Sequence, residues 1–123
     1  MRAEVLLPLG CALGEGASAV NASEFWFVDI RAGQVHRGSV DGSTAVHAQF
    51  DHTVSAVVPT MTGEVVVAGQ QDVSILGEPN AVLTIPETDR DIRLNDGKAD
   101  PIGRFVVGSM AEPVRSSAGS LWS

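Results

Sequence analysis

The stretch Asp100-Pro101-Ile102-Gly103-Arg104-Phe105-Val106-Val107-Gly108 joins a turn to a short apolar run, and this pattern recurs along the chain. Runs like that at 104–108 occur 40 residues earlier, at 64–69, and 40 residues before that, at 24–30. The runs are rich in β-branched and aromatic residues, and each has the length of a buried strand. A turn-forming stretch precedes every run at the same distance: 20–23, 60–63 and 100–103. The repeated unit therefore includes a hairpin.

Further short strands are expected inside each unit. They are separated by Gly-containing turns and lie at 34–37 and 45–50 in the first unit and at 72–76 and 81–85 in the second. Four short strands in a period of about 40 residues are typical of β-propeller blades. No window has helical periodicity, and 13 Gly and 6 Pro interrupt the chain. The sequence predicts an all-β fold of roughly two and a half propeller blades, forming one domain over residues 1–123.

Composition excludes several kinds of partner. The net charge is −7 and the eight Lys and Arg are scattered, whereas nucleic acids and anionic membranes require a basic face. No apolar run approaches the roughly 20 residues of a membrane-spanning helix. Cys11 is the only cysteine, so no internal disulfide is expected. Because residues 1–13 also make a poor signal peptide, a cytoplasmic setting fits best.

Polar residues recur where the innermost strand of each unit begins. In steps of 40, Glu15, Ser55 and Asn95 occupy matching positions, which in a propeller face the central channel. Residues that are distant in sequence can approach one point only near this axis. These positions are therefore the candidates for a binding site.

Glu15 lies between two glycines in Leu13-Gly14-Glu15-Gly16. Glycine on both sides permits a sharp backbone turn and leaves the carboxylate accessible, as a ligand of a hard cation requires. The alternative interpretation is an exposed turn that happens to carry a glutamate.

Arg93 and Asn95 are two residues apart on an expected strand, so their side chains point to the same side. Together they can hold a polyhydroxylated or carbonyl ligand by hydrogen bonds. The alternative is a salt bridge from Arg93 to Asp91 or Asp96 beside an Asn-capped turn. In the same way, Asn-Asp-Gly and Asp-Pro-x-Gly in 95–103 are either two tight turns or a functional loop.

The histidines and tryptophans have simpler interpretations. His36, His47 and His52 have no metal-type spacing, so solvated or packed imidazoles are expected. Trp26 and Trp122 are expected to pack between blades.

Residues 93–104 (RLNDGKADPIGR) resemble the Arg-x-Asn-Asp-Gly-Lys-x-Asp-Pro-x-Gly-Arg signature of the family named for SMP-30, gluconolactonase and regucalcin. Residues 13–16 are similar to the start of its Leu-Gly-Glu-Gly-Pro-x-Trp motif, with Ala17 and Ala19 where Pro and Trp are common. The resemblance extends from about Leu9 to Ser123.

This resemblance implies a fold and an activity. Family members are six-bladed propellers of more than twice this length that hydrolyse sugar lactones with Ca²⁺, Zn²⁺, Mn²⁺ or Mg²⁺. The resemblance makes Glu15 a metal ligand and Arg93 and Asn95 contacts to the lactone. It also implies a metal that polarises the carbonyl and activates water, and an amino-terminal strand at 4–9. The other two metal ligands, an Asn and an Asp, and the general base, which is that same Asp, are expected beyond residue 123.

Two hypotheses follow. The first is a metal-dependent lactone hydrolase of the gluconolactonase type, incomplete in this chain, which by itself should show little or no turnover. The second is a non-catalytic remnant or a binding or assembly module of the same fold. Three repeats do not close a ring, so self-association through open blade edges is expected.

Overall fold

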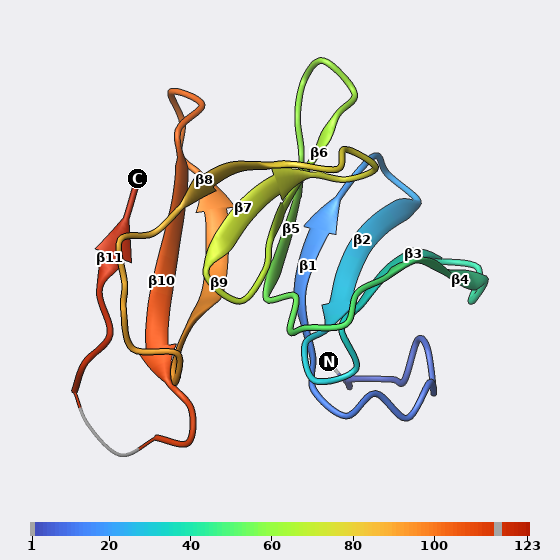
Figure 1. Cartoon of the computed structure of the whole chain (residues 1–123). Coiled ribbons are helices and arrows are strands. Elements are labelled where there is room, and N and C mark those ends of the chain that lie inside the picture. Colours follow the sequence, from blue (N-terminus) through green and yellow to red (C-terminus); the bar gives the residue numbers. More distant parts are fainter. Residues whose placement is uncertain (1, 115–116) are drawn as a thin grey trace.

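The computed structural model describes residues 2–114 and 117–123, which form eleven strands and no helix (Figure 1). The first sheet has the order β1 (Gly14–Ala19), β2 (Glu24–Asp29), β3 (Gln34–Ser39), β4 (Thr44–Gln49). The second has the order β5 (Ala56–Pro59), β6 (Val65–Ala68), β7 (Asp72–Ile75), β8 (Ala81–Thr84). The third is three-stranded: β9 (Ile92–Ala99), β10 (Phe105–Ala111) and β11 (Leu121–Trp122). All strand pairs are antiparallel.

The 40-residue repeat is visible at the level of single hydrogen bonds. In the hairpin that opens each sheet, a backbone amide donates to the carbonyl four residues later: Val20 to Glu24 (2.9 Å), Thr60 to Glu64 (2.8 Å) and Asp100 to Arg104 (2.8 Å). Gly63 and Gly103 complete the second and third turns at φ of 92° and 88°, which glycine adopts without strain. The prediction that the repeat includes its hairpin is confirmed.

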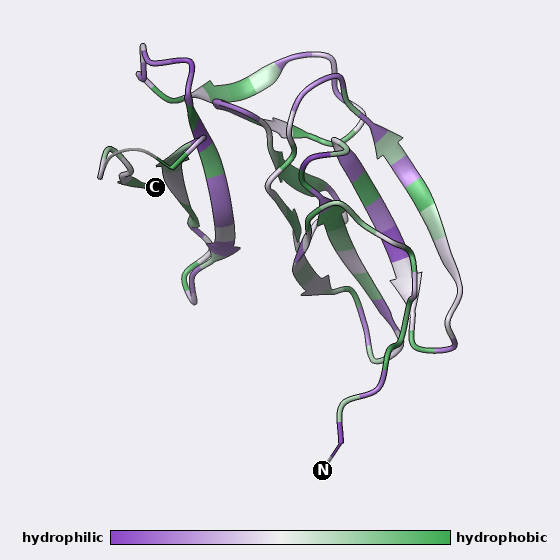
Figure 2. Ribbon diagram, turned by 90° about the horizontal axis from the view of Figure 1, so that it is seen from below, coloured by the Kyte–Doolittle hydropathy of each residue, from purple (hydrophilic) through white to green (hydrophobic). Residues whose placement is uncertain are grey.

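The sheets pack face to face through two hydrophobic clusters. Between the first and second sheets, the buried residues are Trp26, Val28, Ile30, Val35, Val54, Val57 and Val67. Between the second and third they are Ala56, Ala68, Val73, Ile85, Leu94 and Val107, with Trp122 packed against them. Hydrophobic and hydrophilic residues alternate along several strands (Figure 2), as expected for strands that bury one face. Both tryptophans therefore pack between sheets, as predicted.

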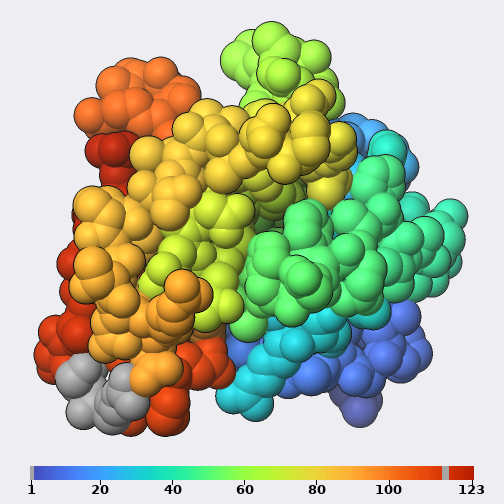
Figure 3. All heavy atoms as spheres, viewed as in Figure 1, coloured from blue at the N-terminus to red at the C-terminus, as the bar shows by residue number. Residues whose placement is uncertain are grey.

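The three sheets are consecutive blades of a β-propeller, with β1, β5 and β9 as neighbouring inner strands. The second blade lies between the first and the third in the space-filling view (Figure 3). Two four-stranded blades and a partial third confirm the predicted fold class.

Two local predictions were wrong. Asn95-Asp96-Gly97 is not a turn: it lies inside β9, where Gly97 pairs with Val107. A Cβ atom at Gly97 would lie 2.7 Å from the ring of Phe105, so glycine here makes room for an aromatic side chain. Residues 4–9 form no strand, because a strand needs a neighbouring edge for its hydrogen bonds and none of the described strands pairs with this segment.

Candidate functional site

Arg93 lies near the start of β9 and is only 5% exposed. Its Nη1 atom donates hydrogen bonds to Oδ1 of Asn95 and to the carbonyl of Leu94, both at 2.9 Å. The structure thus brings Arg93 and Asn95 together on one side of the strand. The Asn95 amide is held by the guanidinium, so its orientation is set before any ligand arrives.

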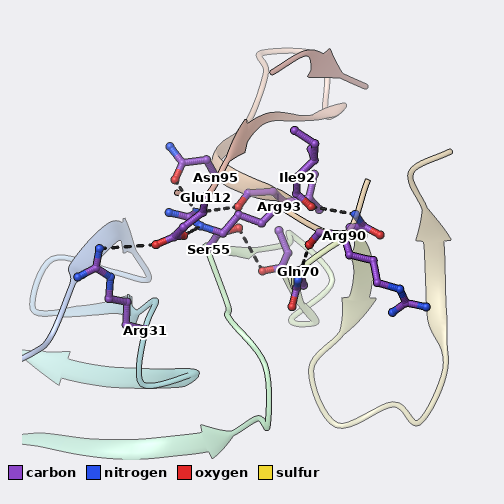
Figure 4. A network of polar contacts seen from close by, with 11 residues as sticks. Arg31, Ser55, Gln70, Arg90, Ile92, Arg93, Asn95 and Glu112 are labelled. Atoms are coloured by element: carbon purple, nitrogen blue, oxygen red, sulfur yellow. Dashed lines mark hydrogen bonds and ion pairs between the residues drawn. The ribbon is translucent and has the colours of Figure 1, made fainter. Parts of the chain in front are cut away.

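Glu112 is the ionic partner of Arg93, and the sequence had not singled it out. Its Oε2 atom accepts a hydrogen bond from Nε of Arg93, and its Oε1 atom lies 3.6 Å from Nη2 of Arg31 (Figure 4). The hydrogen bond from Arg93 is the main cause that holds the pKa of Glu112 below its ordinary value, and the charges of Arg93 and Arg31 add to it. Glu112 is therefore a carboxylate at neutral pH, and it balances the charge of a buried arginine.

The blade repeat explains why these residues meet. Arg31, Gln70 and Glu112 each follow the second strand of their blade by one or two residues. In a propeller these loops converge at one end of the channel. Figure 4 shows Glu112 beside Arg93, Arg31 directed at Glu112, and Gln70 beside Arg90. A search for residues at equivalent positions after the three apolar runs could have found Glu112. No spacing within the motif at 93–104 points to it.

Ser55, predicted to be equivalent to Asn95, is fully buried and has a structural role. Its hydroxyl donates to the carbonyl of Ala68 at 3.3 Å, and its amide donates to the same oxygen at 2.8 Å. Ser55 therefore holds the start of β5 against β6 and leaves no group for a ligand.

A small polar cavity of about 190 Å³ lies beside Arg93. Its lining residues come from the second and third blades and the segment between them: Thr53, Gln70, Arg90, Asp91, Arg93 and Glu112. Gln70 Nε2 donates to the carbonyl of Arg90 at 3.1 Å, which joins the loop after β6 to the segment before β9. We call this the Arg93 cavity.

Glu15 lies elsewhere. It is exposed in β1, opposite Val28, and it lines a separate pocket of about 440 Å³ together with Cys11 and Phe27. Gly16 has a φ of 66°, and the pairing of β1 with β2 is irregular between Glu15 and Ser18. No hydrogen bond or ion pair joins Glu15 to Arg93 or Asn95. Of the three predicted site residues, the structure therefore brings two into contact.

The segment before β1 is anchored by Asp29. Its buried carboxylate accepts hydrogen bonds from the amides of Ala12 (2.8 Å), Leu13 (2.9 Å) and Ala32 (3.4 Å). Burial alone would raise the pKa of Asp29. The hydrogen bonds from the three amides lower it, and the net shift is downward. The ionised carboxylate sets the position from which Glu15 projects.

A divalent cation does not fit the described residues alone. Over residues 2–114 and 117–123, no group of three or more His, Cys, Asp or Glu side chains is arranged to hold a metal ion. Hard cations such as Ca²⁺ take about six to eight oxygen ligands. Glu15 would supply one or two of them. In the same residues, no helix is long and apolar enough to cross a membrane.

Comparisons with known proteins agree with this architecture. The model of the SMP-30/Gluconolactonase/LRE-like region matches residues 13–123. Regucalcin of Gallus gallus is 35% identical over 92 residues, covering 72% of this chain and 31% of the relative. Regucalcin of Macaca fascicularis is 31% identical over 133 residues, covering 100% of this chain and 44% of the relative.

Two solved structures have a similar fold. A luciferin-regenerating enzyme superposes with a TM-score of 0.76 at 27% identity, covering 89% of this chain and 41% of that one. A calcium-binding protein, regucalcin, from Agrobacterium tumefaciens superposes with a TM-score of 0.72 at 26% identity, covering 89% and 39%. The chain thus spans less than half the length of these relatives. The family model matches nearly the whole chain, and the blades superpose on two solved relatives. The chain therefore belongs to the SMP-30/Gluconolactonase/LRE-like family.

Proposed function

We propose that this chain carries the substrate-binding part of a lactone hydrolase of the gluconolactonase type. The observation that supports the proposal most directly is the contact between Arg93 and Asn95 on β9, the inner strand of the third blade. Arg93 is fixed by Glu112, and Asn95 is fixed by Arg93, so two hydrogen-bonding groups are oriented before a ligand binds. Preorganised groups of this kind suit the carbonyl and hydroxyl oxygens of a sugar lactone.

Membership of the family supports the same activity class, since gluconolactonase stands in the family's name. A solved relative is described as a calcium-binding protein, which supports a divalent metal as cofactor. We propose Glu15 as one of its ligands. Because the described residues contain no group of three or more His, Cys, Asp or Glu arranged to hold a metal, turnover would require further ligands, and no catalytic step is assigned to Glu15. The single cysteine and the acidic charge fit a cytoplasmic setting.

A non-catalytic binding module is the second candidate. A contrast between two parts of the chain favours it. The groups around Arg93 form a connected network, whereas the metal position has only one carboxylate. A chain of this kind would bind a lactone or a related polyol without hydrolysing it.

One pair of measurements tests the proposal on the 123-residue chain. Titration calorimetry with D-glucono-δ-lactam, a stable isostere of the lactone, measures binding, and a pH-stat measures glucono-δ-lactone hydrolysis with Ca²⁺, Mg²⁺, Mn²⁺ or Zn²⁺. We expect the lactam to bind and Asn95→Ala to weaken it by about 1.5–3 kcal/mol, the range for a hydrogen bond to a charged or polarised group. We expect little or no turnover by this chain alone.

Hydrolysis is the outcome that separates the two candidates. Hydrolysis that a chelator and Glu15→Gln both abolish would show that association completes a metal site, and would establish the hydrolase. Binding without hydrolysis under any metal is expected of this chain under both candidates, because Glu15 alone supplies too few oxygen ligands for a hard cation. Binding that is unchanged by Asn95→Ala would contradict both, because the ligand would then lie elsewhere.

A further inference from the structure

Thr53 has a buried hydroxyl with no hydrogen-bond partner. Its Oγ1 atom is shielded from solvent, and no described residue donates to it or accepts from it. A hydroxyl removed from water without a partner costs roughly 1–3 kcal/mol. Such a group in a well-packed fold calls for an explanation, and Thr53 lines the Arg93 cavity.

The blade repeat places Thr53 and Arg93 at matching positions of neighbouring blades. Thr53 precedes Ser55 by two residues, as Arg93 precedes Asn95, and the two positions are 40 residues apart. They are thus equivalent residues of the second and third blades, and both line one cavity. Gln70 lies on the same wall, and because its Nε2 donates to the carbonyl of Arg90, its Oε1 remains as an acceptor.

From this arrangement we propose that Thr53 and Gln70 form a subsite for hydroxyl groups of the ligand that Arg93 and Asn95 bind. This inference rests on the proposed lactone site. It adds the groups that select a ring carrying hydroxyl groups over a ring without them. The Thr53 hydroxyl both donates and accepts, and so does a sugar hydroxyl. Thr53 is a specificity residue in this proposal, and it takes no part in bond breaking.

The charges and the size of the cavity define the class of ligand. Two basic and two acidic side chains line the cavity, Arg90, Arg93, Asp91 and Glu112, and Arg93 is paired with Glu112. Because these formal charges cancel, a neutral polyol suits the cavity. The cavity, at about 190 Å³, is smaller than the roughly 300 Å³ of a complete small-ligand site. It therefore suits one edge of a sugar ring.

The test compares two lactams with the same ring, D-glucono-δ-lactam and 2-piperidone, of which only the first carries hydroxyl groups and a hydroxymethyl group. Thr53→Val keeps the shape of the side chain and removes the hydroxyl, and Thr53→Ser keeps the hydroxyl. We expect Thr53→Val to raise the Kd of gluconolactam roughly three- to tenfold, the range for one net hydrogen bond. Binding of 2-piperidone should not change, and Thr53→Ser should bind gluconolactam nearly as the wild type does.

A stability measurement distinguishes a ligand contact from a structural role. Because the hydroxyl of the free protein is unpaired, Thr53→Val should raise the Tm by about 2–4 °C while it weakens binding. Thr84→Val, on the exposed strand β8, is the matched control and should change neither the Tm nor the Kd appreciably.

Several results would overturn the subsite. A lower Tm for Thr53→Val would mean that the hydroxyl is already satisfied, by water or by the protein. If Thr53→Val leaves the Kd of gluconolactam unchanged while Asn95→Ala still weakens binding, the subsite is refuted and the lactone site is not. Absence of gluconolactam binding by the wild type would also refute it. Conversely, binding of gluconolactam that weakens in Thr53→Val and is kept in Thr53→Ser would support the subsite.

Discussion

At the scale of single residues, the site depends on one nearly buried arginine. Arg93 is 5% exposed, and its charge is compensated by Glu112, which is itself about one-third exposed. A buried charge that loses its partner costs far more than an exposed one. Glu112 therefore contributes to stability as well as to the orientation of Asn95.

We expect Glu112→Gln to lower the free energy of unfolding at pH 7 by about 1–3 kcal/mol, because it removes the charge facing Arg93 but keeps an acceptor. The hydrogen bond from Arg93 lowers the pKa of Glu112 in the folded protein below its ordinary value of 4.5. Its contribution is therefore fully present above about pH 4.5 and is lost as the pH falls through the folded value. Urea unfolding of both proteins at a series of pH values should show the difference shrinking in acid.

Glu24→Gln is the matched control for this prediction. Glu24 pairs with Arg37 at 3.0 Å on the surface, and both side chains are more than one-third exposed. Exposed pairs contribute little, so a clearly smaller effect is expected. If Glu112→Gln destabilises the protein equally at every pH, the ionic explanation is wrong.

At the scale of elements, one turn is built with no room for a side chain. Gly33, between β2 and β3, has a φ of 65°, and a Cβ atom there would lie 2.5 Å from the carbonyl oxygen of His52. The turn carrying Arg31 is thus pressed against the segment that leads into the second blade. The position of the turn that carries Arg31, relative to the Arg93 cavity, depends on this contact.

Gly33→Ala should therefore destabilise the protein by roughly 2–5 kcal/mol, since left-handed strain and a backbone clash add. Gly42→Ala makes a matched comparison, because Gly42 has a φ of 88° but no atom within 4 Å of the added Cβ. That variant should lose only about 1–2 kcal/mol, from the strain alone. Thermal unfolding of the two variants measures the difference, and equal losses would show that the contact with His52 can relax.

At the scale of the whole molecule, three blades leave two flanks without a neighbouring blade among the described residues. On the first blade, Leu6, Leu7 and Leu9 lie around the pocket lined by Phe25 and Phe27. On the third, Leu121 of the edge strand β11 is 75% exposed. Apolar flanks and free strand edges favour contact with another chain.

We expect the chain to self-associate, so its mean mass in light scattering should rise with concentration. Leu121→Lys should weaken the association, because a charge on an edge strand opposes pairing. Met61→Lys is the control: Met61 is fully exposed, but it lies at the tip of the β5–β6 hairpin, away from either flank. A monomer at all concentrations, with cooperative unfolding, would contradict the expectation.

The features that depend on neighbours along the chain could be predicted from the amino-acid sequence. The 40-residue period, the strands and the three opening hairpins could be predicted, because alternation and turn residues act over a few positions. That Arg93 and Asn95 lie on one side of their strand could be predicted as well, since residues two apart on a strand share a side; the hydrogen bond between them is a finding of the structure.

Which groups from different blades meet depends on how the sheets pack against one another. Glu112, Arg31, Gln70 and Thr53 lie on separate loops, and the packing of one sheet on the next brings them around Arg93. Sheet pairing also holds Asn95-Asp96-Gly97 within β9. The ring of Phe105 packs where a side chain of residue 97 would lie. Local turn chemistry favoured a turn there, but the hydrogen bonds to β10 and the packing of that ring outweighed it, and neither can be read from the residues of the turn alone.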